Sequence, residues 1–169
     1  NISPDLYSRS ILRGNIPFVD LQPLIRDKNP APVSEKIFDA CKRLGFFYIC
    51  NHGIDDTLSN KYMWHLKNFF SLPLQEKLEV DVRQSDAHRG YFPIHGENND
   101  PDTSLDLKEG FDIMAEHNLN DERVVAGIPF HGPNQWPKNI PGFKEVATLY
   151  YEQMTSLSRM IMSSIAVGF

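Results

Sequence analysis

Cysteine is scarce in this sequence, with 2 residues among 169. Cys41 and Cys50 do not have the close spacing of a zinc or redox pair, and two cysteines are too few for a disulfide-rich scaffold. We therefore expect a reduced protein that is located in the cytoplasm.

Long apolar runs are also missing. No stretch approaches the roughly 20 apolar residues that a membrane-spanning helix needs, and the first residues do not have the pattern of a secretory signal. Acidic residues outnumber basic ones by 22 to 17, which gives a formal net charge of −5. A negative surface disfavours binding to nucleic acid or to an anionic membrane. We expect neither as a partner.

Several motifs that carry catalysis do not occur. The sequence has no Gly-x-Ser-x-Gly elbow and no glycine-rich phosphate or dinucleotide loop. A non-haem iron site needs two histidines and a carboxylate, yet there is no His-x-Asp pair. The one His-x-Glu pair is His95 and Glu97, with His131 as a conceivable third ligand. These three lie in polar loop sequence, so we expect ordinary solvated side chains.

The residues that are present predict a mixture of helices and strands. Hydrophobic residues make up 41% of the chain, as in ordinary globular domains. Apolar spacing predicts strands at 16–21, 46–50 and 108–114, and helices at 32–44, 55–70, 71–78 and from 143 onward. The continuous apolar run at 46–50 indicates a strand buried on both faces. Residues 118–141 contain four prolines and are predicted to be irregular.

These elements do not close a sheet by themselves. A few short strands separated by helices form neither a sandwich nor a doubly wound core. The helical pattern from residue 143 also stays apolar up to the end of the sequence. We therefore expect an α+β region that is a fragment of a larger unit.

The remaining histidines are each expected to be structural or solvated. His52 follows a predicted strand and precedes a glycine, so we expect its ring to bond nearby backbone and fix the turn. His65 lies on the apolar face of the helix at 55–70, which is typical of a core or boundary histidine. His88, His117 and His131 lie in polar loops and are expected at the surface.

The segment Arg89-Gly90-Tyr91 is the best candidate for a ligand-binding wall. It combines a fixed cation, an aromatic hydroxyl and a glycine that lets backbone approach closely. Arg89 could pair with a substrate carboxylate through two hydrogen bonds. The alternative is an arginine that forms a salt bridge with the neighbouring acidic loop, with Tyr91 packed as cover.

Six segments occur in a characteristic order along the chain. They are 16–21, 44–54, 69–77, 89–91, 108–112 and 134–137, and the predicted final helix follows them. Together they resemble the N-terminal region of the isopenicillin N synthase-like family of iron(II)- and 2-oxoglutarate-dependent oxygenases. The resemblance covers nearly the whole chain from about residue 15. No single segment would be specific, but the ordered set is.

The resemblance implies a fold in which this region packs on a double-stranded β-helix (jelly roll) whose main body lies beyond this chain. It also implies that iron is held by a His-x-Asp pair and a distant histidine, and 2-oxoglutarate by an Arg-x-Ser pair, all downstream. We therefore expect no catalytic or metal-binding residue in this chain. Arg89 and Tyr91 match a segment that lines the substrate pocket in some members, whereas His52 matches a structural turn.

The resemblance divides the chain into an arm at 1–15, the non-haem dioxygenase N-terminal region at 16–141, and a long helix at 142–169 that supports the catalytic β-helix. It implies an Fe(II)- and 2-oxoglutarate-dependent oxidoreductase that uses O₂ to hydroxylate, desaturate or close a ring in a small organic substrate. The 169-residue stretch alone would be inactive. The alternatives are a non-catalytic binding or scaffold module, and an iron-dependent oxidase that does not use 2-oxoglutarate.

Overall fold

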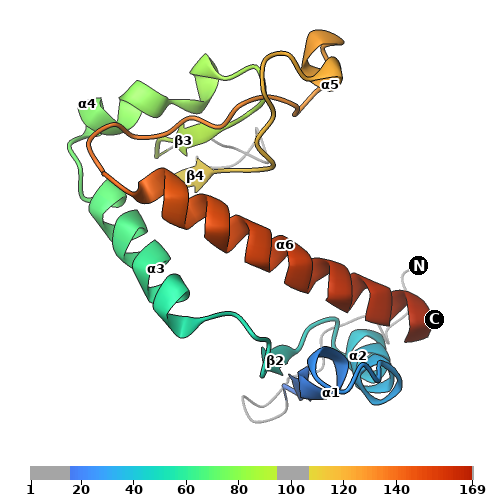
Figure 1. Ribbon diagram of the computed structural model, residues 1–169. Helices are drawn as coiled ribbons and strands as arrows, with labels where there is room; N and C mark the ends of the chain where they lie inside the picture. The colour runs from blue at the N-terminus through green and yellow to red at the C-terminus, as the bar shows by residue number, and fades with distance from the viewer. Residues whose placement is uncertain (1–15, 95–106, 169) are drawn as a thin grey trace, which may run out of the picture. The chain divides into compact units, whose positions relative to one another are not determined.

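The computed structural model describes residues 16–94 and 107–168, and it contains both helices and strands, as predicted (Figure 1). The chain divides into two compact units. Unit 1 comprises the residues up to Asp55 together with those from Glu152 onward, and unit 2 comprises Asp56–Tyr151. The predicted arm at 1–15 lies outside the described residues. The predicted three-part division of the chain stays a prediction.

Unit 1 is built on a parallel pair of strands. Strand β1 (Phe18–Asp20) pairs with β2 (Tyr48–Cys50), and helices α1 (Gln22–Ile25) and α2 (Ala31–Arg43) lie between them in the chain. Proline stands in the first turn of α2, where its missing N–H costs nothing. The buried residues at the centre of this unit are Val19, Leu21, Val33, Ile37 and Leu157.

The second strand differs from the prediction. Only Tyr48–Cys50 is extended, and Phe46 and Tyr48 are about half exposed rather than buried on both faces. A parallel strand is buried on both faces only when other elements cover each face. Here one face of the pair packs inward through Val19, while Phe18 and Tyr48 stack on the other face with ring centroids 5.0 Å apart.

The turn after β2 agrees with the prediction for His52. The backbone N–H of Ile54 donates to Nδ1 of His52 at 3.1 Å, so the ring fixes the turn. Asn51 adopts a positive φ of 51°, which asparagine tolerates better than most residues. Its side-chain amide donates to Asp20 at 2.9 Å and so ties the turn to the end of β1.

Unit 2 contains one long helix, several short ones and an antiparallel pair of strands. Its elements are α3 (Asp56–Phe70), α4 (Leu74–Lys77), the 3₁₀ helices η2 (Leu78–Val80) and η3 (Val82–Gln84), β3 (Gly90–Phe92), β4 (Gly110–Asp112), α5 (Glu122–Val125) and the first part of α6 (Phe143–Gly168). The predicted strand at 108–114 is shorter than expected, and the predicted irregular segment contains the single turn of α5. None of the described helices is long and apolar enough to span a membrane.

Aromatic rings form the core of unit 2. Phe69 of α3 is fully buried and contacts the rings of Tyr91, Phe111 and Phe143, from β3, β4 and α6, with centroids 4.7–6.1 Å apart. His65 lies one turn earlier on the same buried face, 5.9 Å from the ring of Phe143. Its burial agrees with the prediction of a core histidine, although its Nδ1 has no hydrogen-bond partner among the described residues.

Candidate functional site

The segment predicted to line a ligand pocket forms strand β3 at the centre of unit 2. β3 and β4 lie side by side, with Tyr91 opposite Phe111 (Figure 1). Gly90 has a φ of 111°, and a Cβ at this position would lie 2.2 Å from the carbonyl oxygen of Val80. Only glycine satisfies both constraints, so the backbone of this segment is held tightly against the end of η2.

Gln135 holds the beginning of β3 in place. Its side-chain Nε2 donates to the carbonyl oxygen of Arg89 at 2.7 Å and to that of Asp81 at 2.8 Å. One amide from the proline-rich loop therefore satisfies two backbone acceptors from different segments, which would otherwise be costly to bury.

Tyr91 lies in a polar network inside this aromatic core. Its hydroxyl donates to Oε2 of Glu109 at 2.7 Å, and Nζ of Lys77 donates to the same oxygen at 2.7 Å. Burial raises the pKa of the Tyr91 phenol, and the neighbouring Glu109 carboxylate adds to that effect. Burial also opposes ionisation of Glu109, but the hydrogen bonds from Lys77 and Tyr91 outweigh it and hold the pKa of this carboxyl below its usual value.

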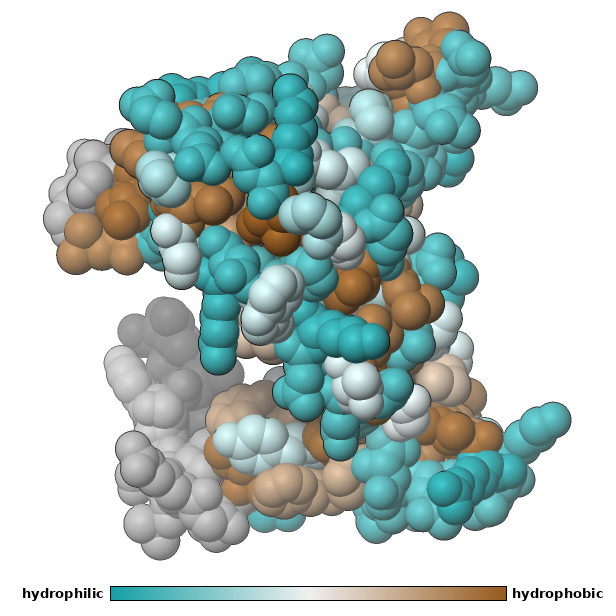
Figure 2. Space-filling view, turned by 60° about the vertical axis from the view of Figure 1, so that its left-hand side comes forward, coloured by the Kyte–Doolittle hydropathy of each residue, from teal (hydrophilic) through white to brown (hydrophobic). Residues whose placement is uncertain are grey.

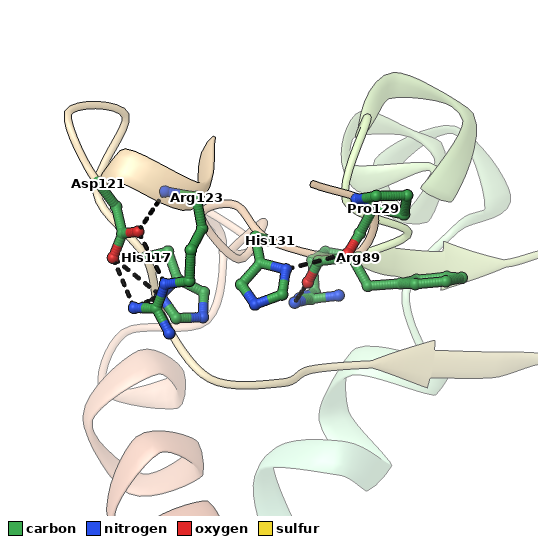
Figure 3. Close-up of polar contacts among 7 residues, drawn as sticks. Arg89, His117, Asp121, Arg123, Pro129 and His131 are labelled. Carbon is green, nitrogen blue, oxygen red and sulfur yellow. Dashed lines mark hydrogen bonds and ion pairs between the residues drawn. The ribbon is translucent and has the colours of Figure 1, made fainter. Parts of the chain in front are cut away.

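Arg89 is almost completely buried and is held by backbone carbonyls (Figure 3). Its guanidinium donates to the carbonyl oxygen of Ala87 and, through Nη2, to that of Phe130 at 2.7 Å. Nε has no partner, and no carboxylate lies within ion-pair distance of Arg89 in residues 16–94 and 107–168. Burial without a paired anion lowers the pKa of this guanidinium.

The structure therefore places Tyr91 in β3 and Arg89 immediately before it, and directs the two side chains to different partners. Tyr91 joins the network with Glu109, and Arg89 braces the loop that contains Phe130. Sequence analysis did not single out Lys77, Glu109 or Gln135. No local spacing connects them, since Lys77 and Glu109 are 32 positions apart. A role of Arg89 and Tyr91 in substrate binding stays a prediction.

No iron-binding set is present in the part of the chain that the structure describes. Among those residues, no group of three or more His, Cys, Asp or Glu side chains is arranged to hold a metal ion. His95 and Glu97 of the conceivable His95–Glu97–His131 trio lie outside the described residues. The described residues thus do not fit an iron centre of the two-histidine, one-carboxylate type.

Residues 16–139 match the family described as "non-haem dioxygenase in morphine synthesis N-terminal". The chain belongs to this family. The match contains β1 to α5 and therefore both the two-stranded pair of unit 1 and the β3–β4 core of unit 2. This result agrees with the resemblance found in the sequence.

Curated relatives of this family member are oxidoreductases from several kingdoms. The chain is 32% identical to a homoarginine-6-hydroxylase of Arabidopsis thaliana, with 90% of this chain and 44% of the relative covered. It is 34% identical to a probable iron/ascorbate oxidoreductase of Dictyostelium discoideum (90% and 45% covered) and 32% identical to a clavatol oxidase of Penicillium crustosum (89% and 49%). The chain thus spans about half the length of the curated relatives that it matches.

Solved structures share the fold of this chain. A 2OG-Fe(II) oxygenase family protein from Caulobacter crescentus matches with a TM-score of 0.74 at 20% identity, covering 91% of this chain and 48% of that one. A full-length protein of Neurospora crassa, solved in complex with alpha-KG, matches with a TM-score of 0.70 at 25% identity, covering 90% and 46%. The mixed helix and strand arrangement of this chain therefore occurs within longer solved proteins.

Proposed function

We propose that this chain is the N-terminal region of an Fe(II)- and 2-oxoglutarate-dependent oxygenase that oxidises a small organic substrate with O₂. The observation that carries the proposal is the family match over residues 16–139, together with relatives named as hydroxylases and oxidoreductases. Iron, 2-oxoglutarate and O₂ would supply the oxidising chemistry. Because the described residues offer no iron-binding set, we assign both cofactors to a portion of the protein outside this chain.

The exposed apolar residues of unit 1 support a missing partner element. Phe18 is 68% exposed and stacks on the half-exposed Tyr48, although both lie in strands. Figure 2 shows hydrophobic residues, in brown, reaching the surface of the molecule on the face drawn. We propose that the jelly-roll body of the whole protein covers the Phe18–Tyr48 face.

Within this proposal the chain contributes scaffold and one wall of the substrate pocket. The wall is β3, whose backbone position is fixed by Gly90 and Gln135. Arg89 would pair with an anionic substrate group, since no described carboxylate lies within ion-pair distance of it and its Nε has no hydrogen-bond partner. Its Nη1 and Nη2 already donate to the carbonyl oxygens of Ala87 and Phe130. Tyr91 would act through its packing and its bond to Glu109, because its hydroxyl is already engaged.

The decisive experiment measures turnover of 2-oxoglutarate by the full-length protein. Succinate formation that requires both Fe(II) and 2-oxoglutarate is the expected result, with the 169-residue chain inactive in the same assay. O₂ consumption that does not need 2-oxoglutarate would favour the iron-dependent oxidase instead. A complete protein that binds neither iron nor 2-oxoglutarate would support the non-catalytic module and overturn the proposal.

The role of Arg89 is tested separately by Arg89→Ala and Arg89→Lys in the full-length protein. If Arg89 pairs with the substrate, KM of the folded fraction for an anionic substrate rises by about tenfold or more, corresponding to about 1.4 kcal/mol, in addition to the fall in Tm from the lost bonds to Ala87 and Phe130. If Arg89 only braces the carbonyls of Ala87 and Phe130, the Tm falls and KM of the folded fraction is unchanged. Tyr91→Phe, two positions further along the chain, provides the matched variant.

A further inference from the structure

Two histidines of unit 2 face each other next to the Arg89 loop. His117 lies between β4 and α5, His131 lies after α5, and their ring centroids are 5.0 Å apart with the planes tilted by 37°. His131 is half-buried, and the side chain of His117 is 12% exposed. Figure 3 shows the two rings side by side, each with one nitrogen that makes no marked contact.

The other nitrogen of each ring contacts a group that can accept a hydrogen bond. Nδ1 of His131 lies 3.0 Å from the carbonyl oxygen of Pro129, which can only accept, so this nitrogen carries the hydrogen. Nδ1 of His117 lies 3.3 Å from Oδ2 of Asp121. In His131 a hydrogen on Nδ1 leaves the lone pair on Nε2, and in His117 the same holds for the tautomer that donates to Asp121.

Asp121 is itself held in place for this contact. Arg123 donates to its carboxylate through Nε at 2.9 Å and Nη2 at 2.7 Å, so the charge of Arg123 is matched locally. Nη2 of Arg123 also lies 3.1 Å from Nδ1 of His117. In one neutral tautomer of His117, Nδ1 accepts a hydrogen bond from Arg123, and in the other tautomer Nδ1 carries the hydrogen and donates to Asp121. A neutral imidazole can exchange between these two tautomers.

Backbone contacts fix the distance between the two segments. The N–H of His117 donates to the carbonyl oxygen of Gly132 at 3.2 Å, directly beside His131. Arg89 braces the same loop through the carbonyl of Phe130. The two rings are therefore positioned before any ligand arrives, which reduces the entropy cost of binding.

We propose that His117 and His131 together bind one divalent transition-metal ion of the Zn²⁺, Ni²⁺ or Cu²⁺ class through their Nε2 atoms. Two imidazoles on a tetrahedral ion, with metal–nitrogen bonds of about 2.0 Å, have ring centroids about 5 Å apart, which matches the observed spacing. Metal-binding histidines characteristically donate their second nitrogen to a carboxylate or a backbone carbonyl, as Asp121 and Pro129 allow here.

This site differs in kind from the proposed iron centre. No third His, Cys, Asp or Glu of the described residues completes it, so water fills the remaining positions. Two neutral nitrogen ligands favour Cu²⁺, Ni²⁺ and Zn²⁺ over the iron that carboxylate-containing sites take. We expect binding in the micromolar range, independent of 2-oxoglutarate.

The test uses the full-length protein stripped of metal, titrated with Zn²⁺ in a calorimeter and with Cu²⁺ followed by electron paramagnetic resonance. Wild type should bind one more ion than His117→Gln/His131→Gln, and each single variant should weaken that site at least tenfold. The Cu²⁺ signal of the extra site should show coupling to two nitrogens. His88→Gln, an exposed histidine of the same unit, is the control and should match wild type.

A second measurement needs no variant. Zn²⁺ should slow the modification of His117 and His131 by diethyl pyrocarbonate at least fivefold and leave that of His88 unchanged. Equal stoichiometry and affinity for wild type and the folded double variant would overturn the proposal. Equal protection of all three histidines would also overturn it.

Discussion

The carboxylate of Glu109 is important for the stability of unit 2, because one of its oxygens accepts hydrogen bonds from both Lys77 and Tyr91. The side chain of Lys77 is only 10% exposed, and its other contact is the carbonyl of Phe70 at 3.4 Å. Removing the carboxylate therefore leaves a buried ammonium without an anion, and such an unpaired buried charge strongly lowers the free energy of unfolding.

Glu109→Gln should lower the free energy of unfolding by about 2 kcal/mol at pH 7, less than a fully buried pair because the carboxylate is partly solvated. The folded state depresses the pKa of Glu109, so its contribution is present above the unfolded value of 4.5 and is lost as pH falls through the folded pKa. The stability difference between wild type and Glu109→Gln should thus narrow between pH 5 and pH 3. Urea unfolding at pH 7, 5 and 3 measures it.

The control for this prediction is Tyr91→Phe, which removes one hydrogen bond but keeps the ion pair. It should cost about 1 kcal/mol. A difference between wild type and Glu109→Gln that stays constant with pH would show that folding does not shift the pKa of Glu109.

At the scale of elements, the position of β3 against η2 depends on a glycine. Gly90→Ala would place a Cβ 2.2 Å from the backbone oxygen of Val80 and 2.7 Å from Nε2 of Gln135, at a φ that L residues rarely adopt. We expect a loss of roughly 3 kcal/mol or more in unfolding free energy, because backbone has to move. Thermal and urea unfolding measure the loss.

Gly127→Ala is the matched control in the same unit. Gly127 has a φ of +65° but nothing within 4 Å of its Cβ position, so the substitution costs only the left-handed backbone conformation, about 1 kcal/mol. Equal losses for the two variants would mean that β3 can shift away from Val80 without penalty.

Sequence patterns predicted the helices better than the strands, and the reason is physical. α2 and α3 are predicted by apolar residues three and four positions apart, such as Val33 and Ile37. β3 and β4 contain three residues each, which is too short to show the alternation of apolar and polar residues that is typical of a strand. Their pairing also joins positions that are twenty residues apart, such as Tyr91 and Phe111. Phe46 and Tyr48 look like core residues in sequence, because hydrophobicity does not say which elements cover them.

The candidate site shows the same limit. Arg89 and Tyr91 could be singled out because they flank a glycine, but their partners could not. Lys77 ends a short helix and resembles a solvated surface lysine until the fold brings Glu109 to it. Long-range polar pairs are set by topology, and a single sequence contains no local signal for them.

At the scale of the whole molecule, the proposed jelly-roll body predicts that Phe18 of unit 1 is buried in the full-length protein. A phenylalanine that is 68% exposed contributes little to stability, so Phe18→Ala would cost well under 1 kcal/mol if the face around it stayed open. If a further sheet or helix covers Phe18 and Tyr48 in the full-length protein, the same substitution removes a buried ring and should cost about 3 kcal/mol. Urea unfolding of the full-length protein distinguishes the two values.

Val125→Ala is the control for this comparison, since Val125 is 75% exposed and lies in α5 of unit 2, whereas Phe18 belongs to unit 1. Its cost should stay within about 0.5 kcal/mol. Equal, small losses for Phe18→Ala and Val125→Ala would show that nothing covers the aromatic face, and the non-catalytic module would then account better for the chain. A large loss confined to Phe18→Ala would connect the exposed strand pair to the body that we propose holds the iron.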